Sequence, residues 1–414
     1  MEKLSLKELA VPLIKSIDSF NYLLKSHHRR TAVIAYNTAV KMGLSDMDMI
    51  YLVIAAAMHD IGALSVQERD MLINEDVTNP EPHCVMGYRM LQSFDVFREV
   101  AQIIKHHHIK YNETDRFEDR IPLQSHIIHL ADRVDILINP DKFILNQKRD
   151  VTERINDKCG TVFHPDVCGA FMEAAKADIF WIEINNMTIE QLFNKICFDM
   201  SFELTLKQTI QFALTVSRII DFRSRYTAAH SYTVGHLAYT MGKYLGFNEE
   251  DATKLLIAGY FHDIGKIGID TAFIEKEGPL TDDEYNHVKL HSYYTGQILN
   301  GLGQNGWFAD IINWAQYHHE KANGKGYPYA ISGDQLSTGT KIISYADIIS
   351  ALMEDRPYRK SMGMEKTFQL IGSNIAADID TEMFHEFEKH RDELEVIVDR
   401  CSSEAMEIYS KNIQ

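Results

Sequence analysis

The sequence predicts an all-α fold arranged as two tandem helical-bundle domains, and two observations support this. Apolar residues recur at helical spacing, and the alternation typical of strands is scarce. The clearest helical segments are 46–60, 249–263 and 296–319. The tetrad His-Asp-Ile-Gly also occurs twice, at 59–62 and 262–265, within a longer repeated order of polar residues. The distance between the copies is that of a whole domain, so we expect residues 1–200 and 201–414 to fold separately.

The composition is that of an ordinary soluble globular protein. The chain has 414 residues, of which 45% are apolar and 24% are charged. Its formal net charge of −17 argues against general affinity for duplex nucleic acid or an anionic membrane, because no diffuse positive field attracts phosphate groups. Any phosphate ligand must therefore be held locally.

The N-terminal sequence and the cysteines both indicate a cytoplasmic location. Residues 1–20 form an amphipathic pattern with interleaved Lys and Glu, unlike a signal peptide. No apolar run approaches the roughly 18 residues of a membrane span. The cysteines are scattered without a CxxC pair, so we expect free thiols in a reducing compartment. They are Cys84, Cys159, Cys168, Cys197 and Cys401.

The two tetrads belong to a longer repeat whose spacing changes along the chain. His27 stands 32 residues before His59, and His230 stands 32 residues before His262, so this block aligns without a gap. Further on, the offset between matching residues grows from 203 to 215, which places insertions between the polar landmarks. The later matches pair His83 with His291, His107-His108 with His318-His319, and Asp132 with Asp347.

One register in the first copy is open, because residues 106–108 are three consecutive histidines. We prefer His107 and His108 as the matching pair, since this register aligns the apolar residues that precede them. Those residues are 103–104 in the first copy and 314–315 in the second.

Adjacent His and Asp side chains in an apolar setting need partners, and this series suggests a metal ion. Imidazole and carboxylate ligands suit iron, manganese, zinc and related divalent ions, and an Asp can bridge two of them. Two such ions can clamp a phosphodiester and activate a hydroxide, which is a hydrolase arrangement. A single His near an apolar face is more often an ordinary hydrogen-bonded residue. The joint order, found twice, argues against that interpretation.

Several longer motifs surround the second copy. They are DFRSRYTAAHS around His230, HDIGKIGI at 262–269, VKLHSYYTGQIL around His291, HHEKANGKGYP at 318–328, YADIISAL around Asp347 and DRPYRKSM at 355–362. On these motifs, residues 221–400 resemble the HD-GYP family of bacterial cyclic-dinucleotide phosphodiesterases. The tandem layout, with a first HD-type domain that lacks the GYP loop, is similar to members specific for 3′3′-cyclic GMP-AMP.

The resemblance implies a site with two divalent transition-metal ions. Iron and manganese are expected first, with nickel, cobalt and zinc as alternatives, and Asp263 would bridge the ions and act in catalysis. Some relatives add a Glu four residues before the first His and bind a third metal, but Tyr226 holds that position here, so we expect two ions. The implied ligands are His230, His262, Asp263, His291, His318, His319 and Asp347.

Four further residues are implied to act on the substrate. Lys266 lies one helical turn beyond His262 if the helix continues, which would direct its ammonium group toward the phosphate. Tyr327, in the turn-forming NGKGYP segment, would face the substrate, and Arg356 and Arg359 would contact phosphate oxygens. Each has a plainer interpretation as a solvated cation or a residue of a surface turn.

The first copy keeps the residue types of a metal site but departs in its catalytic parts. Ala63 stands in place of the counterpart of Lys266, and no GYP loop follows the histidines. Ile109 replaces the counterpart of Glu320, although the family tail is still visible at 160–171. We expect this domain to be catalytically silent and to regulate or stabilise its partner, with metal binding left open. The retained residues are His27, His59, Asp60, His83, His107, His108 and Asp132.

The expected function is hydrolysis of a cyclic dinucleotide to a linear one by the C-terminal domain. The tandem layout favours 3′3′-cyclic GMP-AMP, with cyclic di-GMP second, and no individual residue decides between guanine and adenine. The alternatives are an HD-type nucleotide phosphohydrolase, against which the GYP loop and the DRPYR segment argue, and a non-catalytic metal or ligand sensor. We expect the N-terminal domain to pack on the catalytic one, and homodimer formation is left open.

Overall fold

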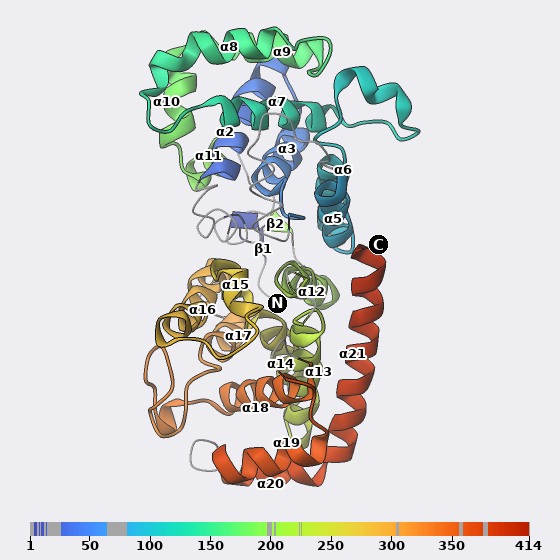
Figure 1. Ribbon diagram of the computed structural model, residues 1–414, viewed down its shortest axis with the longest axis vertical. Coiled ribbons are helices and arrows are strands. Elements are labelled where there is room, and N and C mark those ends of the chain that lie inside the picture. The colour runs from blue at the N-terminus through green and yellow to red at the C-terminus, as the bar shows by residue number, and fades with distance from the viewer. Residues whose placement is uncertain are drawn as a thin grey trace. The chain divides into compact units, whose positions relative to one another are not determined.

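The computed structural model describes most of the chain, and it divides into two compact units. The first unit is Ser5–Phe202, and the second is Glu203–Gln414 together with Met1–Leu4. Both are built from helices, as Figure 1 shows, so the all-α prediction is confirmed. The described residues are 4–5, 8, 10–11, 14, 26–63, 81–196, 201–202, 204–222, 224, 226–303, 306–355, 359–375 and 380–413.

The first unit is a bundle in which α2 packs against α3, α7 and α9. Two strands of two residues each, β1 (Leu4–Ser5) and β2 (Ser201–Phe202), pair with each other, and all of their residues except Leu4 belong to this unit. The helices of this unit are α2 (His27–Met42), α3 (Asp46–Met58), α5 (Glu81–Leu91), η1 (Asp95–Phe97), α6 (Arg98–Lys105), η2 (Tyr111–Arg116), α7 (Leu123–Leu137), η3 (Ile144–Gln147), α8 (Lys148–Asn156), α9 (Pro165–Ala175), α10 (Asp178–Asn186) and α11 (Ile189–Lys195).

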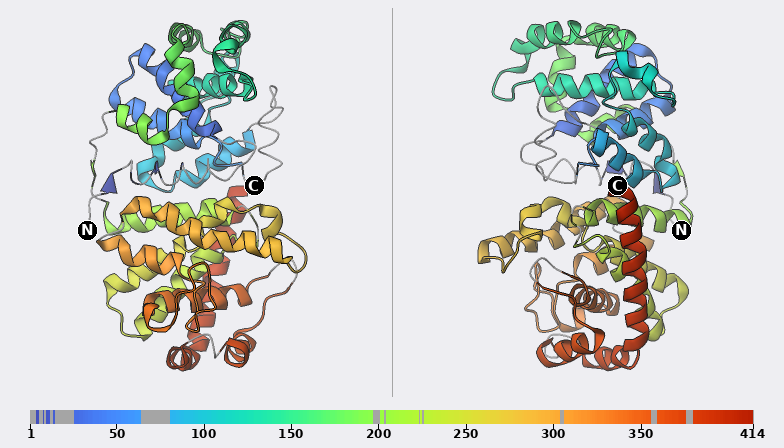
Figure 2. Two further views of the ribbon diagram at one scale, coloured as in Figure 1. Left: turned by 90° about the vertical axis from the view of Figure 1, so that its left-hand side faces the viewer. Right: turned by 45° about the vertical axis from the view of Figure 1, so that its right-hand side comes forward.

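The second unit is centred on α13, which packs against α14, α18 and the long C-terminal helix α21 (Figure 2). Its helices are α12 (Leu206–Asp221), α13 (His230–Tyr244), α14 (Glu249–Phe261), η4 (Ile264–Gly268), α15 (Thr271–Ile274), α16 (Asp282–Leu299), η5 (Asn300–Leu302), α17 (Trp307–Gln316), η6 (Gly333–Gln335), α18 (Thr338–Met353), α19 (Met364–Leu370), η7 (Ile371–Ile375), α20 (Thr381–Lys389) and α21 (Arg391–Ile413).

Local sequence explains where the central helices begin and end. Ser45 caps α3 by accepting a hydrogen bond from the backbone N–H of Asp48, and Asn248 caps α14 in the same way. The predicted helical segment 296–319 is divided instead between α16 and α17. Gly303 and Gly306 lie at this break with positive φ angles of 98° and 81°, which only glycine adopts easily.

The repeat in the sequence is also a repeat of helices. His27 is the first residue of α2, and His230 is the first residue of α13. His59 directly follows the last residue of α3, and His262 directly follows the last residue of α14. Each copy of the tetrad therefore begins where a buried helix stops, which leaves its polar side chains free to turn toward a common centre.

The glycine of the tetrad is required by close packing. A Cβ atom at Gly265 would lie 1.9 Å from the carbonyl oxygen of His291, and one at Gly62 would lie 2.1 Å from that of His83. The tetrad therefore rests directly on the backbone of the helix that carries the third histidine of each copy. Only a residue without a side chain permits this approach.

The prediction of free thiols is wrong for two of the cysteines. Cys159 and Cys168 form a disulfide across a separation of 9 residues. A reversal at Gly160, whose φ is 77°, brings the two Cα atoms to 6.1 Å, and a CxxC search gives no sign of it. Cys84 and Cys401 are free and buried, and Cys197 lies outside the described residues.

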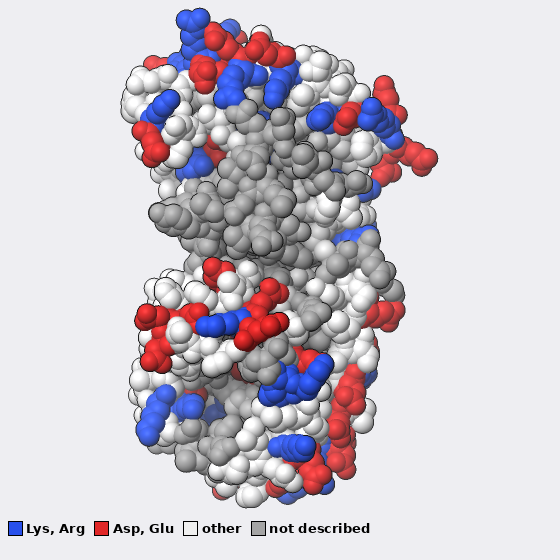
Figure 3. Space-filling model, in the orientation of Figure 1, with Lys and Arg blue, Asp and Glu red and all other residues white. Residues whose placement is uncertain are grey.

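No helix in the described part of the chain combines the length and the apolar character needed to cross a membrane. On the face of the second unit shown in Figure 3, acidic and basic side chains are interspersed. The described residues of that face form no broad positive surface for phosphate groups, in agreement with the overall negative charge.

Candidate metal centre

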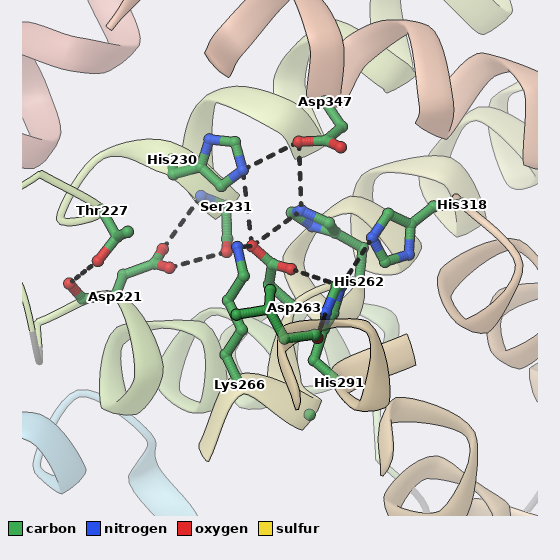
Figure 4. Close-up of polar contacts among 12 residues, drawn as sticks. Asp221, Thr227, His230, Ser231, His262, Asp263, Lys266, His291, His318 and Asp347 are labelled. Atoms are coloured by element: carbon green, nitrogen blue, oxygen red, sulfur yellow. Dashed lines mark hydrogen bonds and ion pairs between the residues drawn. The ribbon is translucent and has the colours of Figure 1, made fainter. Parts of the chain in front are cut away.

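Three helices of the second unit bring one group of ligand-type side chains together. His230 comes from α13, His262 from the end of α14 and Asp347 from α18, and their ligand atoms lie within 4.8 Å of one another (Figure 4). The Nε2 atoms of His230 and His262 lie 3.2 and 3.9 Å from Oδ1 of Asp347. This group has the composition and closeness of a site for one divalent ion.

A second group of three histidines lies beside the first. It consists of His291 on α16 and the consecutive His318 and His319 after α17. The Nδ1–H groups of His291 and His318 both donate to backbone carbonyls, those of Val288 and Ala315, each at 2.6 Å. Their Nε2 atoms therefore carry lone pairs, yet these atoms lie only 3.4 Å apart. Two lone pairs at this distance repel each other unless a cation lies between them. His291 and His318 are therefore placed to share a metal ion.

Asp263 joins the two groups. Its Oδ2 lies 3.3 Å from Nε2 of His262 and 3.6 Å from Nε2 of His230, whereas its Oδ1 lies 3.5 Å from Nε2 of His291. One carboxylate oxygen thus faces each group, as a bridging ligand requires. In addition, Nε2 of His262 and Oδ1 of Asp263 are buried without a hydrogen-bond partner. Such orphaned atoms are costly in a protein interior and fit the coordination of ions.

The protonation states of these residues suit metal binding. Burial lowers the pKa of His291 to about 3 and that of His319 to about 4, so both imidazoles are neutral at pH 7. Burial by itself would raise the pKa of Asp263, but His262 and Lys266 outweigh it and hold this pKa well below its usual range. The carboxylate is therefore ionised, which is the form that binds a cation.

Lys266 also points to the metal centre, but it lies in a 3₁₀ helix and not in the continued α-helix that the sequence predicted. The α-helix ends at Phe261, and the chain continues as the 3₁₀ helix η4. The ammonium group of Lys266 forms an ion pair with Oδ2 of Asp263. The cation implied by the sequence therefore contacts the carboxylate that links the two groups of histidines.

Known proteins match both halves of the chain. Residues 24–137 and residues 214–383 each match a family model described as an HD domain. The chain carries two HD domains. The two matches coincide with the two copies of the repeat.

Several curated relatives are cyclic-dinucleotide phosphodiesterases. The chain is 27% identical to 3′3′-cGAMP-specific phosphodiesterase 1 of Vibrio cholerae over 399 residues, which are 92% of this chain and 90% of the relative. It is 38% identical to phosphodiesterase 3 of the same specificity and organism over 42% of this chain and 37% of the relative. It is 33% identical to the cyclic di-GMP phosphodiesterase response regulator RpfG of Xanthomonas campestris over 36% of this chain and 39% of the relative.

A solved structure supports the fold over the whole chain. The cyclic GMP-AMP-specific phosphodiesterase V-cGAP3 of Vibrio cholerae aligns with a TM-score of 0.61 and 21% identity, and the alignment covers 94% of this chain and 98% of that one. The curated relatives confirm the resemblance to HD-GYP-type cyclic-dinucleotide phosphodiesterases.

The loop of the second HD domain that contains Tyr327 lies against the candidate centre. The Tyr327 ring lies 4.8 Å from the ring of His319, measured between centroids. The buried carboxylate of Glu320 organises this loop, because its two oxygens accept hydrogen bonds from the backbone N–H groups of Tyr329 (2.7 Å) and Ile331 (3.0 Å). Gly326 passes so close to Glu320 that a Cβ there would lie 2.4 Å from the Glu320 Cα. We did not predict from the sequence that Glu320 holds this loop. The first copy lacks the loop and has Ile109 in place of Glu320, and this difference could have indicated the role.

Of the two arginines in the DRPYRKSM segment, only Arg359 lies among the described residues. Arg356 lies outside the described residues. Arg359 donates hydrogen bonds to the carbonyls of Ala351 (2.6 Å) and Leu352 (2.8 Å) at the end of α18. Its guanidinium group is thus engaged with backbone, and its contact with substrate stays a prediction.

Asp221, a buried residue missed by the sequence interpretation, supports the start of α13. Its carboxylate accepts hydrogen bonds from the backbone N–H of Ser231 (3.1 Å) and from its hydroxyl group (2.9 Å), as Figure 4 shows. Burial raises the pKa of Asp221 to about 7. This contact joins α12 to the turn of helix that begins with His230.

The first HD domain repeats the two groups of ligand-type side chains. His27, His59 and Asp132 form one group, and Asp60 lies with His83, His107 and His108 in another. His107 and His108 thus take the places expected from the preferred register, whereas the ring of His106 lies 6.3 Å from that of Phe117. Ala63, in place of a lysine, is buried beside Asp60.

Proposed function

We propose that the second HD domain hydrolyses a cyclic dinucleotide to the linear dinucleotide. The observation that carries this proposal is the position of Asp263, whose two oxygens face two groups of histidines while Lys266 pairs with one of them. Such a carboxylate suits two ions that hold a phosphodiester between them. The relative that matches over most of the chain is named for 3′3′-cGAMP, and RpfG is named for cyclic di-GMP. We therefore propose 3′3′-cyclic GMP-AMP as the first candidate substrate and cyclic di-GMP as the second.

The proposed ligands are the seven residues implied by the sequence, and iron and manganese are the first candidate ions. When bound, the ions supply Lewis-acid chemistry for the attack of water on the phosphodiester. Asp263 remains ionised and holds the two halves of the centre together. Lys266 is partly exposed, with 18% of its side chain accessible, so its ammonium group can turn from Asp263 toward a phosphate oxygen. There it would stabilise the negative charge that grows in the transition state.

A cavity beside the centre is large enough for part of a dinucleotide. It has a volume of ≈ 320 Å³ and is lined by residues that include Tyr285, His319, Tyr327, Lys341 and Asp347. The volume is that of a small ligand site, so it suits one nucleoside. Tyr327 lines this cavity, and its ring lies 4.8 Å from the ring of His319, measured between centroids. A substrate held against Tyr327 would therefore lie next to the metal centre.

The activity is tested by turnover of a panel of nucleotides. The full chain, loaded with ferrous or manganous ions, is incubated separately with 3′3′-cyclic GMP-AMP, cyclic di-GMP, cyclic di-AMP and deoxynucleoside triphosphates. We expect linear dinucleotides to appear by chromatography, and the Asp263→Ala chain to give none. Hydrolysis of the triphosphates alone would instead support a nucleotide phosphohydrolase, and binding without turnover would support a sensor.

We propose that the protein acts in the cytoplasm. We further propose that the first unit regulates or stabilises the second by packing against it. The support is the asymmetry between the copies, since the first keeps its ligand-type residues but has Ala63 and Ile109 in place of Lys266 and Glu320. Substitutions in the first HD domain of the full chain should then change the turnover or the melting temperature of the second. Unchanged values for both would contradict this role. Whether the chain forms a homodimer is decided by its mass in solution.

A further inference from the structure

The first HD domain contains a cluster of imidazoles and carboxylates as complete as that of the second. Nε2 of His27 lies 3.4 Å from Oδ1 of Asp132, and Nε2 of His59 lies 3.2 Å from Oδ2 of Asp60. On the other side, Nε2 of His83 lies 3.3 Å from Oδ1 of Asp60. Asp60 therefore directs one oxygen toward each group of histidines, as Asp263 does in the second domain.

Hydrogen bonds at the rim of this cluster direct the Nε2 atoms of His107 and His59 toward its centre. His107 donates its Nδ1–H to the carbonyl of Ile104 (2.7 Å), so its Nε2 carries a lone pair, and this atom lies 3.3 Å from Nε2 of His83. His59 likewise donates its Nδ1–H to the carbonyl of Ala56 (2.8 Å). The buried atoms Nε2 of His59 and Oδ1 of Asp60 have no hydrogen-bond partner. Buried lone pairs that converge in this way call for a cation.

His28 adds an imidazole that the second domain lacks. Its ligand atom lies within 4.8 Å of those of His59 and Asp60, and its Nε2 is 3.9 Å from Oδ2 of Asp60. The matching residue of the second domain is Ser231, whose hydroxyl group is bonded to Asp221 instead. The first cluster is therefore richer in nitrogen ligands than the second.

The side of the cluster that would admit a substrate is filled by side chains. The ring of His129 lies 5.8 Å from that of His108 and 5.4 Å from that of Phe163. Arg133 covers Oδ2 of Asp132, to which it donates a hydrogen bond of 2.7 Å. The residues that match His129 and Arg133 in the second domain are the smaller Ser344 and Ile348, both of which line its cavity.

We propose that the first HD domain holds divalent metal ions of its own in a closed site, with His28 as an added ligand, and that it does not turn over a dinucleotide. Its ligands are imidazole and carboxylate, with more imidazole than in the second domain. This composition favours zinc, iron, cobalt or nickel over magnesium or calcium. The proposal does not depend on the activity of the second domain.

Metal content of full-length variants tests the site. In the His262→Ala/Asp263→Ala chain, whose second centre is disabled, we expect roughly two transition-metal ions per chain to remain after dialysis, by elemental analysis. Adding His59→Ala and Asp60→Ala should remove them. If that quadruple variant fails to fold, titration of zinc into the metal-stripped double variant, followed by calorimetry, replaces it. A double variant that neither retains nor takes up metal overturns the proposal, and would mean that a proton on His27, held between two aspartates, balances the cluster.

The role of His28 is tested by replacing it with serine, the residue at the matching position, Ser231, of the second domain. His28→Ser in the same double variant should weaken zinc binding tenfold or more, as measured by competition with a chromophoric chelator. His385→Ala, at a histidine whose side chain is 63% exposed, is the control and should leave the affinity unchanged. Equal affinity of the His28→Ser chain and its parent would exclude His28 as a ligand. Turnover by the wild-type chain is measured separately, so failure of the proposed phosphodiesterase activity does not affect either result.

Discussion

Oε2 of Glu354 lies 3.1 Å from Nδ1 of His230, so this buried carboxylate orients the first histidine of the second HD domain. In the first domain the same contact is made by Asp135, whose Oδ2 lies 2.7 Å from Nδ1 of His27. Asp135 follows Asp132 by three residues on α7, but the residue three after Asp347 on α18 is Ser350. Glu354 supplies the carboxylate from one turn further along, and the Ser350 hydroxyl group donates to it at 2.7 Å.

The first prediction concerns this orienting carboxylate. Glu354→Ala should lower the metal affinity of the second centre by about 10–100-fold, because a metal-bound His depends on the partner of its other ring nitrogen. Adding Ser350→Asp, which reproduces the spacing of Asp132 and Asp135, should restore much of the loss. Chelator competition measures the affinity, and excess metal should rescue turnover. Equal affinities for Glu354→Ala and the wild-type chain would show that His230 needs no carboxylate partner.

The second prediction concerns the ligands themselves. His262→Ala and Asp263→Ala should each remove metal from the second centre and abolish turnover together, because Asp263 faces both groups of histidines. Elemental analysis and product chromatography on the same preparation measure the two effects. A variant that kept both its metal and its activity would disprove the assignment of the site.

The third prediction separates Lys266 from the metal ligands. Lys266→Ala should leave the metal content intact and lower turnover on the order of a hundredfold, as the loss of one charged contact in a transition state often does. Lys360→Ala, at a lysine whose side chain is 90% exposed, is the matched control and should have no effect. Loss of metal from the Lys266→Ala chain would make this lysine a structural support of Asp263. Ala63→Lys in the first domain should not create a second active site.

The fourth prediction concerns the loop held by Glu320. Glu320→Ala leaves the backbone N–H groups of Tyr329 and Ile331 without the carboxylate that accepts their hydrogen bonds. The loop with Tyr327 should then become mobile, so KM should rise more than kcat falls, and limited proteolysis should cut near residue 327. The metal content should stay the same. A fall in kcat with an unchanged KM would indicate that Glu320 acts on the chemistry instead.

The fifth prediction concerns pH and the first unit. Burial lowers the pKa of His126 to about 4 in the folded chain, so folding favours its neutral form. The stability due to this group is fully present above its unfolded pKa of about 6.5 and is lost as pH falls from 6.5 to 4, by up to about 3 kcal/mol. His126→Gln should flatten this part of the dependence of unfolding free energy on pH. His385→Ala is the control, and an unchanged pH dependence in His126→Gln would contradict the prediction.

Much of the fold and of the centre could be read from the sequence because chemistry and periodicity recur in it. The apolar pattern before each tetrad predicted α3 and α14, and the polar order after it predicted which histidines converge. Helical spacing failed at 296–319, since Gly303 and Gly306 end one helix and begin another. The cysteine spacing likewise gave no sign of the Cys159–Cys168 disulfide, which depends on a reversal of the chain at Gly160.

The sequence by itself determined the ligand types, their order and their duplication, because a metal site needs particular side chains wherever they lie in the chain. Only the tertiary structure decided which carboxylate orients each first histidine, which glutamate holds the loop, and which copy is open to a substrate. Glu354 is 124 residues from His230, and their contact exists only because α13 packs against α18. The closure of the first centre by His129 and Arg133 arises in the same way, since side chains block a site through the packing of helices and not through their spacing along the chain.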